Sequence, residues 1–377
     1  MTPKTGTYVT RVWLAGVGPA LAHLRGDTLY DITSKTAPTM RDLLELPDIS
    51  AHLATVEARA IGPLVTITAA SNEAKGEVTH LLSPADLQAI KACGVTFARS
   101  MIERVIEERA AGDPTRAATI RTRITEAIGT TLQTLRPGSP ESAKVKQMLI
   151  AEGLWSQYLE VGIGPDAEVF TKSPPMASVG QGASIGLHPI SKWNNPEPEV
   201  VLAVNSKGHI LGATLGNDVN LRDVEGRSAL LLGKAKDNNA SAAIGPMIRL
   251  FDDSFSLEDV RQLTLTLTVH GADGFHLEGR SSMAEISRDP ADLVAQTIGT
   301  HHQYPDGFML YCGTMFAPVQ DRDGPGQGFT HHLGDLVTIA TPALGNLTNT
   351  VRLSTQAPPW TFGTAALMRN LARRGLL

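Results

Sequence analysis

The sequence predicts an α+β protein in which a β-rich C-terminal half follows a smaller N-terminal region of strands and helices. Apolar and polar residues alternate strictly over residues 263–269, as in a strand with one buried face. Apolar residues recur instead at helical spacing over residues 87–106, where charged residues separate them. No regular alternation of strands and helices, which would indicate a parallel α/β sheet, is present. We therefore expect the C-terminal half to fold as a mixed β-sandwich or roll.

The length of 377 residues exceeds the usual size of a single hydrophobic core, so we expect two domains. The change from helical to strand patterns falls near residue 160. We expect an N-terminal domain of residues 1–160, with a small β part to about residue 80 and helices after it. Residues 161–377 would form the second domain.

The composition is that of an ordinary folded protein, with 42% hydrophobic and 19% charged residues. A formal net charge of −5 gives no reason to expect nucleic acid or an anionic membrane as partner. Two cysteines are too few for a disulfide framework and fit a reducing cytoplasm. No apolar run reaches transmembrane length, and the first five residues lack the apolar core of a signal peptide. We therefore expect a cytoplasmic location.

In the N-terminal region, residues 7–15 and 63–70 have the composition of strands, and the second stretch is rich in β-branched residues. Ser83, Pro84 and Asp86 then form a typical helix start, with a capping hydroxyl, a proline at the first helical position and an acid in the first turn.

Residues 83–158 are expected to be a helical block that serves packing and subunit contact. A second helix should run to about residue 135, and a third should begin at Ser139. The solvent-facing side of the first helix is assigned to its charged residues, which are Glu103, Arg104, Glu107, Glu108 and Arg109.

The C-terminal half contains short strands separated by turns. Besides residues 263–269, we expect strands at 168–172 and 336–340, and a hairpin of 199–204 with 209–214. One helix is expected at about residues 289–300.

Two glutamates, Glu197 and Glu199, are spaced i, i+2 where this hairpin begins. Alternate residues of a strand point to the same side, so both carboxylates should project together, about 7 Å apart along the backbone. Like charges this close repel unless a positive charge lies between them. The simplest partner is a bound cation, and the alternative is two solvated glutamates on a surface strand.

The second strand of the hairpin returns toward the same end and leads into Asp218. Three carboxylates without an adjacent cysteine or histidine favour a hard cation, Mg²⁺ or Mn²⁺, over zinc. The sequence therefore predicts a metal site of Glu197, Glu199 and Asp218.

The order and spacing of several motifs resemble the fumarylacetoacetate hydrolase superfamily over residues 162–351. The resemblance is carried by 194–199, Gly216-Asn217-Asp218, Arg222-Asp223, Gly233-Lys234 and Gly313-Thr314. It implies a mixed β-sandwich roll that is usually dimeric or higher, so we expect a homodimer or homotetramer. It also implies a divalent metal on Glu197, Glu199 and Asp218 that chelates a 2-oxo acid or 1,3-dicarbonyl compound. By motif position, substrate would meet Lys172, Arg222, Lys234 and Thr314.

Two departures from the hydrolases stand out. The hydrolases activate water with a histidine and a glutamate before the strand that ends at Lys172. Here residues 152–162 contain Glu152 and Glu160 but no histidine. The hydrolases also usually carry glutamine at the position of Glu225. Both departures resemble the branch that dehydrates 2-keto-3-deoxy-D-xylonate or 2-keto-3-deoxy-D-arabinonate.

That branch implies Mg²⁺-dependent dehydration of a 2-keto-3-deoxy pentonate to 2,5-dioxopentanoate (2-oxoglutarate semialdehyde), as in oxidative pentose catabolism. Chelation of the carboxylate and ketone would stabilise the enolate formed when the C3 proton leaves. We expect Lys234 to take this proton, because nearby positive charge lowers the pKa of an ammonium. We expect Glu225 to protonate the leaving hydroxyl, because burial raises the pKa of a carboxyl. The remaining expected substrate-binding residues are Lys172, Arg222, Asn238, Ser281, Ser282 and Thr314.

Simpler roles stay open for these residues. Lys234 would serve equally as an electrostatic clamp, and Glu225 as an ion-pair partner of Arg222 or Arg227. Ser281 and Ser282 fit a turn at a strand end. Two other functions also remain: hydrolysis of acylpyruvates with Glu152 or Glu160 activating water, and metal-dependent binding of keto acids without turnover.

Overall fold

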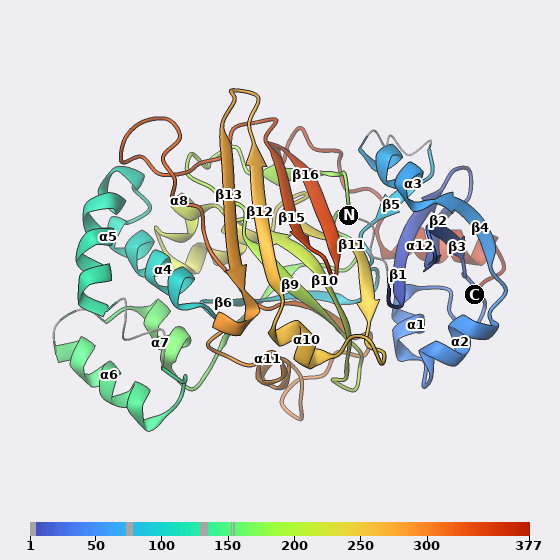
Figure 1. Cartoon of the computed structure of the whole chain (residues 1–377), viewed down its shortest axis with the longest axis horizontal. Coiled ribbons are helices and arrows are strands. Elements are labelled where there is room, and N and C mark those ends of the chain that lie inside the picture. Colours follow the sequence, from blue (N-terminus) through green and yellow to red (C-terminus); the bar gives the residue numbers. More distant parts are fainter. Residues whose placement is uncertain (1–4, 73–77, 129–134, 152, 154) are drawn as a thin grey trace.

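The computed structural model describes residues 5–72, 78–128, 135–151, 153 and 155–377 (Figure 1). Expectations for the first four residues, for Glu152 and for the stretch 129–134 of the second helix lie outside these ranges. No helix in the described part is long and apolar enough to cross a lipid bilayer.

An 11-stranded sheet runs through the molecule, in the order β4-β3-β2-β1-β11-β10-β9-β14-β6-β7, with β5 paired to β1. Its strands are β1 (Tyr8–Leu14), β2 (Gly18–Arg25), β3 (Thr28–Asp31), β4 (Arg59–Pro63), β5 (His80–Leu82), β6 (Ala89–Gly94), β7 (Glu168–Ser173), β9 (Pro198–Val204), β10 (Ile210–Asp218), β11 (Ala242–Leu250) and β14 (Phe308–Tyr311). The sheet is mixed, because β14 pairs parallel with β6 and antiparallel with β9.

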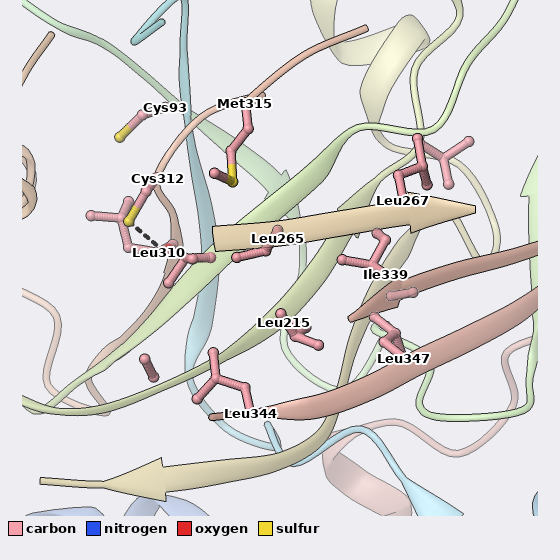
Figure 2. Close-up of a cluster of buried hydrophobic side chains, with 14 of the residues drawn as sticks. Cys93, Leu215, Leu265, Leu267, Leu310, Cys312, Met315, Ile339, Leu344 and Leu347 are labelled. Carbon is pink, nitrogen blue, oxygen red and sulfur yellow. Dashed lines mark hydrogen bonds between the residues drawn. The ribbon is translucent and has the colours of Figure 1, made fainter. Parts of the chain in front are cut away.

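A second, 5-stranded sheet has the order β13-β12-β15-β16-β8 and packs on one face of the first. Its strands are β8 (Ser184–Leu187), β12 (Thr264–His270), β13 (His276–Ser282), β15 (Leu336–Thr341) and β16 (Gly345–Leu353). Figure 2 shows Leu215 of β10 among Leu265 of β12, Ile339 of β15 and Leu347 of β16. The main hydrophobic core therefore lies between two sheets, which confirms the expected α+β fold with a mixed β-sandwich roll.

The helices lie around this sandwich. They are α1 (Met40–Glu45), α2 (Ile49–Thr55), α3 (Leu64–Ser71), α4 (Ala98–Ala110), α5 (Pro114–Ile128), α6 (Pro140–Ala151), α7 (Gln157–Ile163), α8 (Arg222–Glu225), α9 (Leu232–Lys236), α10 (Leu257–Arg261), α11 (Pro290–Thr297) and α12 (Thr364–Arg373), with short 3₁₀ turns at Ala229–Leu231 and Met283–Glu285. Helices α4 to α7 gather at one end of the molecule, and α1, α2 and α12 lie with β1 to β5 at the other (Figure 1).

The strand expected at residues 63–70 is wrong. The β3–β4 ladder ends at Pro63, which pairs with Thr28, and α3 begins at the next residue. Leu64 and Ile67 both bury against the N-terminal strands, because residues three apart share one face of a helix. Tertiary packing thus outweighs the strand preference of this β-branched run.

The helix start expected at Ser83 is also wrong, because residues 89–94 form the buried strand β6 and the next helix, α4, begins only at Ala98. Asp86 does not cap a following helix. Its carboxylate accepts hydrogen bonds from the backbone N–H groups of Met40 and Arg41 and lies 3.4 Å from Arg11. A short apolar run such as that of β6 suits a buried strand as well as a helix, so spacing alone does not decide.

The other expected elements are confirmed within the described residues: the strands at 7–15, 168–172, 263–269 and 336–340, the β9–β10 hairpin, the helix near 289–300 and a helix starting at Ser139–Pro140. The domain boundary at residue 160 stays a prediction. Strands from both sides of it belong to the large sheet, where β1 pairs with β11 and β6 with β14.

Candidate metal and active site

Three carboxylates meet where β9 begins and β10 ends. Glu199 lies opposite Gly216 in the β9–β10 ladder, and the backbone N–H of Asp218 donates to the carbonyl of Glu197 at 3.1 Å. This register brings carboxylate oxygens of Glu197, Glu199 and Asp218 to within 4.8 Å of one another, and all three residues are buried. The structure therefore brings together the three carboxylates that the spacing and the hairpin predict.

Gly216 makes room for this arrangement. A side chain at this position would place its first carbon 2.4 Å from the ring of Tyr311 on β14. The hydroxyl of Tyr311 donates a hydrogen bond to the carbonyl of Ala243, which holds the ring in this position. A glycine is required here by close packing, directly opposite Glu199.

Cationic side chains surround two of the carboxylates. The ammonium of Lys236 lies 2.6 Å from Glu197 and 3.0 Å from Asp218, and that of Lys172 lies 2.7 Å from the other oxygen of Asp218. Arg104 of α4 reaches the second oxygen of Glu197 at 2.5 Å.

Glu199 has neutral partners instead. Its oxygens accept from the backbone N–H of Gly313 at 2.7 Å and from the hydroxyl of Thr314 at 3.3 Å. Burial raises the pKa of Glu199 well above its usual range, and Asp218 and Glu197 raise it further. The cluster is therefore short of positive charge at Glu199.

These residues fit a divalent magnesium ion. The donors are carboxylate oxygens, the ligands that Mg²⁺ prefers, and among the described residues this is the one group of three potential ligands with such spacing. Cys93 lies beside the same site, but burial raises the pKa of its thiol well above the usual value, so it stays a poor ligand. Glu197, Glu199 and Asp218 would hold the ion.

A cavity of about 10 Å³ lies beside the carboxylates, roughly the space that one water molecule needs. Its ionisable wall residues are Arg104, Glu168, Glu197, Asp218, Glu225, Lys236 and Cys93, and its other wall residues include Thr314, Phe170 and Ser100. A larger cavity of about 350 Å³ lies elsewhere, between β1, residues 176–184 and residues 358–362. It contains none of the predicted site residues, so we place the chemistry in the smaller cavity.

Two carboxyl groups of this cavity, the buried Glu225 and the partly buried Glu168, are not part of the metal cluster. Burial raises the pKa of Glu225 to about 7, although Arg104, 3.0 Å from its Oε2, lowers it. Burial likewise raises the pKa of Glu168 at the start of β7, against Arg104 and Lys236. Burial thus favours the protonated form of both carboxyl groups, and for Glu225 it does so up to about neutral pH, as a proton donor requires.

Lys234 is not brought to the cavity. Its side chain is exposed, and its backbone carbonyl accepts a hydrogen bond from the side-chain amide of Asn238. Lys236, two residues later on α9, is buried and bridges Glu197 and Asp218. Residues two apart on a helix point to nearly opposite sides, so only one of these lysines can face inward. We replace Lys234 by Lys236 among the candidate site residues.

The expected substrate-binding residues are divided. Thr314 lines the cavity, and Lys172 lies just behind it, where its ammonium donates to the carbonyls of Val219, at 3.1 Å, and Lys236. Arg222 is fully buried, stacks on Trp193 and donates to Glu103 and Glu107 of α4, so it holds a helix in place. The remaining three do not line the cavity: Asn238, Ser281 and Ser282.

Ser281 lies on β13, where its hydroxyl donates to the carbonyl of Met315 at 3.4 Å. Ser282 caps the 3₁₀ turn that follows, accepting from the backbone of Ala284. Both therefore have the strand-end role that the sequence left open.

The assignment of the α4 charges to solvent is wrong for Glu103, Arg104 and Glu107, which are buried. They face Arg222 and Glu225 of α8 and Glu197, which directly precedes β9, so each buried charge meets an opposite one. Sequence reasoning missed Arg104, Glu168 and Lys236. The local signal for Lys236 was its position two residues after Lys234, which made it an alternative lysine. Nothing in the sequence around Arg104 indicates that it pairs with Glu197, 93 residues away.

Comparison with known proteins agrees with this geometry. Residues 163–352 match the family described as fumarylacetoacetate hydrolase, C-terminal. A protein of Haloferax volcanii named probable 2-keto-3-deoxyxylonate dehydratase is 29% identical over 225 residues, 60% of this chain and 71% of the relative. The 2-dehydro-3-deoxy-D-arabinonate dehydratase of Saccharolobus solfataricus is 29% identical over 185 residues, 49% of this chain and 58% of the relative.

Among solved structures, 2-keto-3-deoxy-D-arabinonate dehydratase complexed with magnesium and 2,5-dioxopentanoate has a similar fold. The TM-score is 0.63 at 19% identity, over 92% of this chain and 99% of the other. The family match covers half of the sequence, and the hairpin, the three carboxylates and Thr314 all lie within it. The chain belongs to the fumarylacetoacetate hydrolase family.

Proposed function

We propose that the protein is a Mg²⁺-dependent dehydratase that converts a 2-keto-3-deoxy pentonate to 2,5-dioxopentanoate and water. The observation that carries the proposal is a group of three buried carboxylates beside a cavity that is lined by two of them, Glu197 and Asp218, by the buried Lys236 and by two further carboxyl groups with raised pKa values. The names of the two similar dehydratases support the same substrate class.

The proposed reaction begins with loss of a C3 proton and of the C4 hydroxyl. The resulting C3–C4 double bond is conjugated with the C2 ketone, so a C5 proton is acidic and is transferred to C3. The enol left at C4–C5 then takes a proton at C4 and loses one from oxygen, which gives the aldehyde. The net change is the loss of one water molecule, with no oxidant or reductant.

A bound divalent ion would supply positive charge for the substrate's carboxylate and ketone, which favours loss of the C3 proton and lowers the pKa of Lys236. Burial lowers the pKa of Lys236, but Asp218, Glu197 and Glu225 outweigh this effect and raise it. Lys236 is the residue we assign to accept the C3 proton, because its nitrogen lies beside Glu197 and Asp218, where a bound divalent ion would oppose the ammonium charge and favour the neutral amine.

Glu225 is the residue we assign to protonate the leaving hydroxyl, since burial raises its pKa to about 7 and so favours its protonated form. Glu168 is the second carboxyl group at the cavity and is the candidate for the later proton transfer between C5 and C3. Thr314 holds Glu199 and borders the cavity, so it orients both a metal-binding residue and the substrate.

Hydrolysis of acylpyruvates is less well supported. Glu160 on α7 pairs with Lys146 at 2.5 Å, is partly exposed and does not line the cavity, and Glu152 lies outside the described residues. Binding without turnover does not account for two carboxyl groups at the cavity whose pKa values are raised. A cytoplasmic location, a homodimer or homotetramer and a role in oxidative pentose catabolism stay predictions.

The test is incubation of the purified protein with Mg²⁺ and 2-keto-3-deoxy-D-xylonate or 2-keto-3-deoxy-D-arabinonate, with detection of the aldehyde product. Formation of 2,5-dioxopentanoate that stops when the metal is chelated is expected. Absence of the aldehyde, together with cleavage of an acylpyruvate under the same conditions, would overturn the proposal in favour of a hydrolase.

A further inference from the structure

The guanidinium of Arg104 occupies a position where three acids converge. Its Nη2 lies 2.5 Å from Glu197, and its Nη1 lies 2.6 Å from Glu107 and 3.0 Å from Glu225. The side chain is 10% exposed. Arg104 therefore links helix α4 both to a predicted metal-binding residue and to the predicted proton donor.

The contact with Glu197 competes with a divalent cation. Lys236 already holds one oxygen of Glu197, and Arg104 holds the other. A divalent cation bound to this carboxylate would lie within a few ångströms of both side chains and repel them. Lys236 is anchored a second time by Asp218, whereas the remaining partners of Arg104 lie on α4 and α8.

The cavity in this arrangement has space for about one water molecule, too little for a five-carbon acid. Arg104 and α4 form one wall of it, and α4 lies at the end of the large sheet beside α8 (Figure 1). Admitting a substrate therefore requires a wall of the cavity to move, and a movement of the α4 wall would carry the guanidinium with it.

A 2-oxo acid brings a carboxylate that needs a cationic partner. Lys172 is occupied by Asp218 and two carbonyls, and Arg222 by Glu103, Glu107 and the carbonyl of Pro318. Among the described residues that line the cavity, the cations are Lys236, which we assign to proton transfer, and Arg104.

We propose that Arg104 exchanges partners: it pairs with Glu197 until a divalent cation and a 2-oxo acid bind, and then turns to the carboxylate of that acid. Arg104 is thus a positioning residue that selects substrates carrying a carboxylate next to a ketone and couples their entry to movement of α4. The inference rests on the proposed function for the identity of the ligand. The test measures only binding of Mg²⁺ and of a ligand, so its result can be interpreted whether or not the protein dehydrates a sugar acid.

The experiment compares the wild type with Arg104→Met, Arg104→Lys and a control, Arg109→Met. Arg109 is exposed on the same helix and donates to the carbonyls of Gly153 and Trp155. Calorimetry first measures Mg²⁺ binding alone. It then measures binding of oxalate, a stable dicarboxylate mimic of a 2-oxo acid, to the Mg²⁺-saturated protein.

The exchange predicts opposite changes in the two affinities. Arg104→Met should bind Mg²⁺ alone several-fold more tightly, because a competing cation is gone, and should bind oxalate about tenfold more weakly, because a charged hydrogen bond is lost. Arg104→Lys keeps the positive charge, so it serves as the variant that should still fold. It should change both affinities in the same directions as Arg104→Met, but by smaller factors. Arg109→Met should match the wild type.

Any other pattern overturns the proposal. If Arg104 only holds the fold together, both affinities fall in Arg104→Met and return in Arg104→Lys. If oxalate binding is unchanged in both variants, the carboxylate has another partner. If Mg²⁺ binding alone is unchanged or weaker, Arg104 does not compete with the metal.

Discussion

The site has two halves of different origin, one carried by the large sheet and one by helices. The sheet half consists of Glu197, Glu199 and Asp218, whose positions follow from the β9–β10 register and a glycine opposite Glu199. The helix half consists of Arg104 on α4, Glu225 on α8 and Lys236 on α9. The two short helices α8 and α9 span four and five residues, too few to be stable alone.

The difference indicates a division of labour. A ladder of backbone hydrogen bonds fixes the sheet carboxylates at the mutual spacing that a metal ion needs. The helix residues are held by ion pairs instead, so their positions respond to charge at the cavity. We infer that the sheet half binds the metal and the helix half transfers protons and orients substrate, and four substitutions test this separation.

The largest effect is expected for Lys236→Met. Loss of the residue assigned to take the C3 proton should lower kcat by about 10³-fold. Mg²⁺ affinity should not fall, because the substitution removes a cation from Glu197 and Asp218. Turnover assays and calorimetry measure the two quantities. Lys234→Met is the matched control and should behave as wild type; equal losses in the two variants would contradict our choice of lysine.

Glu225→Gln should lower kcat by about 10²-fold, as expected for loss of one positioned acid. The pKa of Glu225 is raised to about 7, so the protonated form that donates exists below this pH. Wild-type turnover should therefore fall as the pH rises through about 7. A pH–rate profile should lose this limb in Glu225→Gln. Persistence of the limb there, and its disappearance in Glu168→Gln, would transfer the role to Glu168.

Glu199→Gln should lower Mg²⁺ affinity by roughly 10- to 100-fold, the range seen when groups that support a metal site are altered. The amide keeps the size of the side chain but removes the charge that attracts the ion. At saturating Mg²⁺ much of the turnover should return, because Lys236 and Glu225 are untouched. Calorimetric titration checks the affinity. An activity loss that excess metal does not relieve would place Glu199 in the chemical step as well.

Ser281→Ala should have the smallest effect. The hydroxyl makes one long hydrogen bond, 3.4 Å, to Met315, so its loss should cost at most about 1 kcal/mol in the free energy of unfolding. Turnover should match the wild type, since β13 does not border the cavity. Urea unfolding and steady-state kinetics test both statements. A clear rise in KM would return Ser281 to the substrate site.

The same division explains what the sequence could reveal. The i, i+2 glutamates and the returning strand lie within 22 residues, so local spacing predicts that Glu197, Glu199 and Asp218 meet. Strand alternation at 263–269 likewise predicts the sandwich core. It is harder to predict which residue of a short helix faces the site. Lys234 and Lys236 lie on opposite faces of α9, and tertiary packing decides which face is buried.

Contacts between residues far apart in the sequence were the hardest to predict. The charged residues of α4 have the spacing expected of a solvent-exposed helix face. They are buried because Glu197, Arg222 and Glu225, which lie far away in the sequence, pair with them. Asp86 and β6 show the same limit. A capping pattern followed by apolar residues is a helix start in most contexts, but here Asp86 caps α1 and β6 pairs with a strand more than 200 residues later.

The position of β14 has a consequence for the chain during its synthesis. This strand lies between β9 and β6, and the residues just after it donate both hydrogen bonds that hold Glu199. A ribosome translates Glu197, Glu199 and Asp218 about a hundred residues before this strand and the threonine behind it emerge. The nascent chain therefore carries its three carboxylates without the partners of Glu199 until about a hundred further residues have been added. A fragment that ends before residue 308 neither closes the large sheet nor fixes Glu199, so residues 308–314 complete this part of the site.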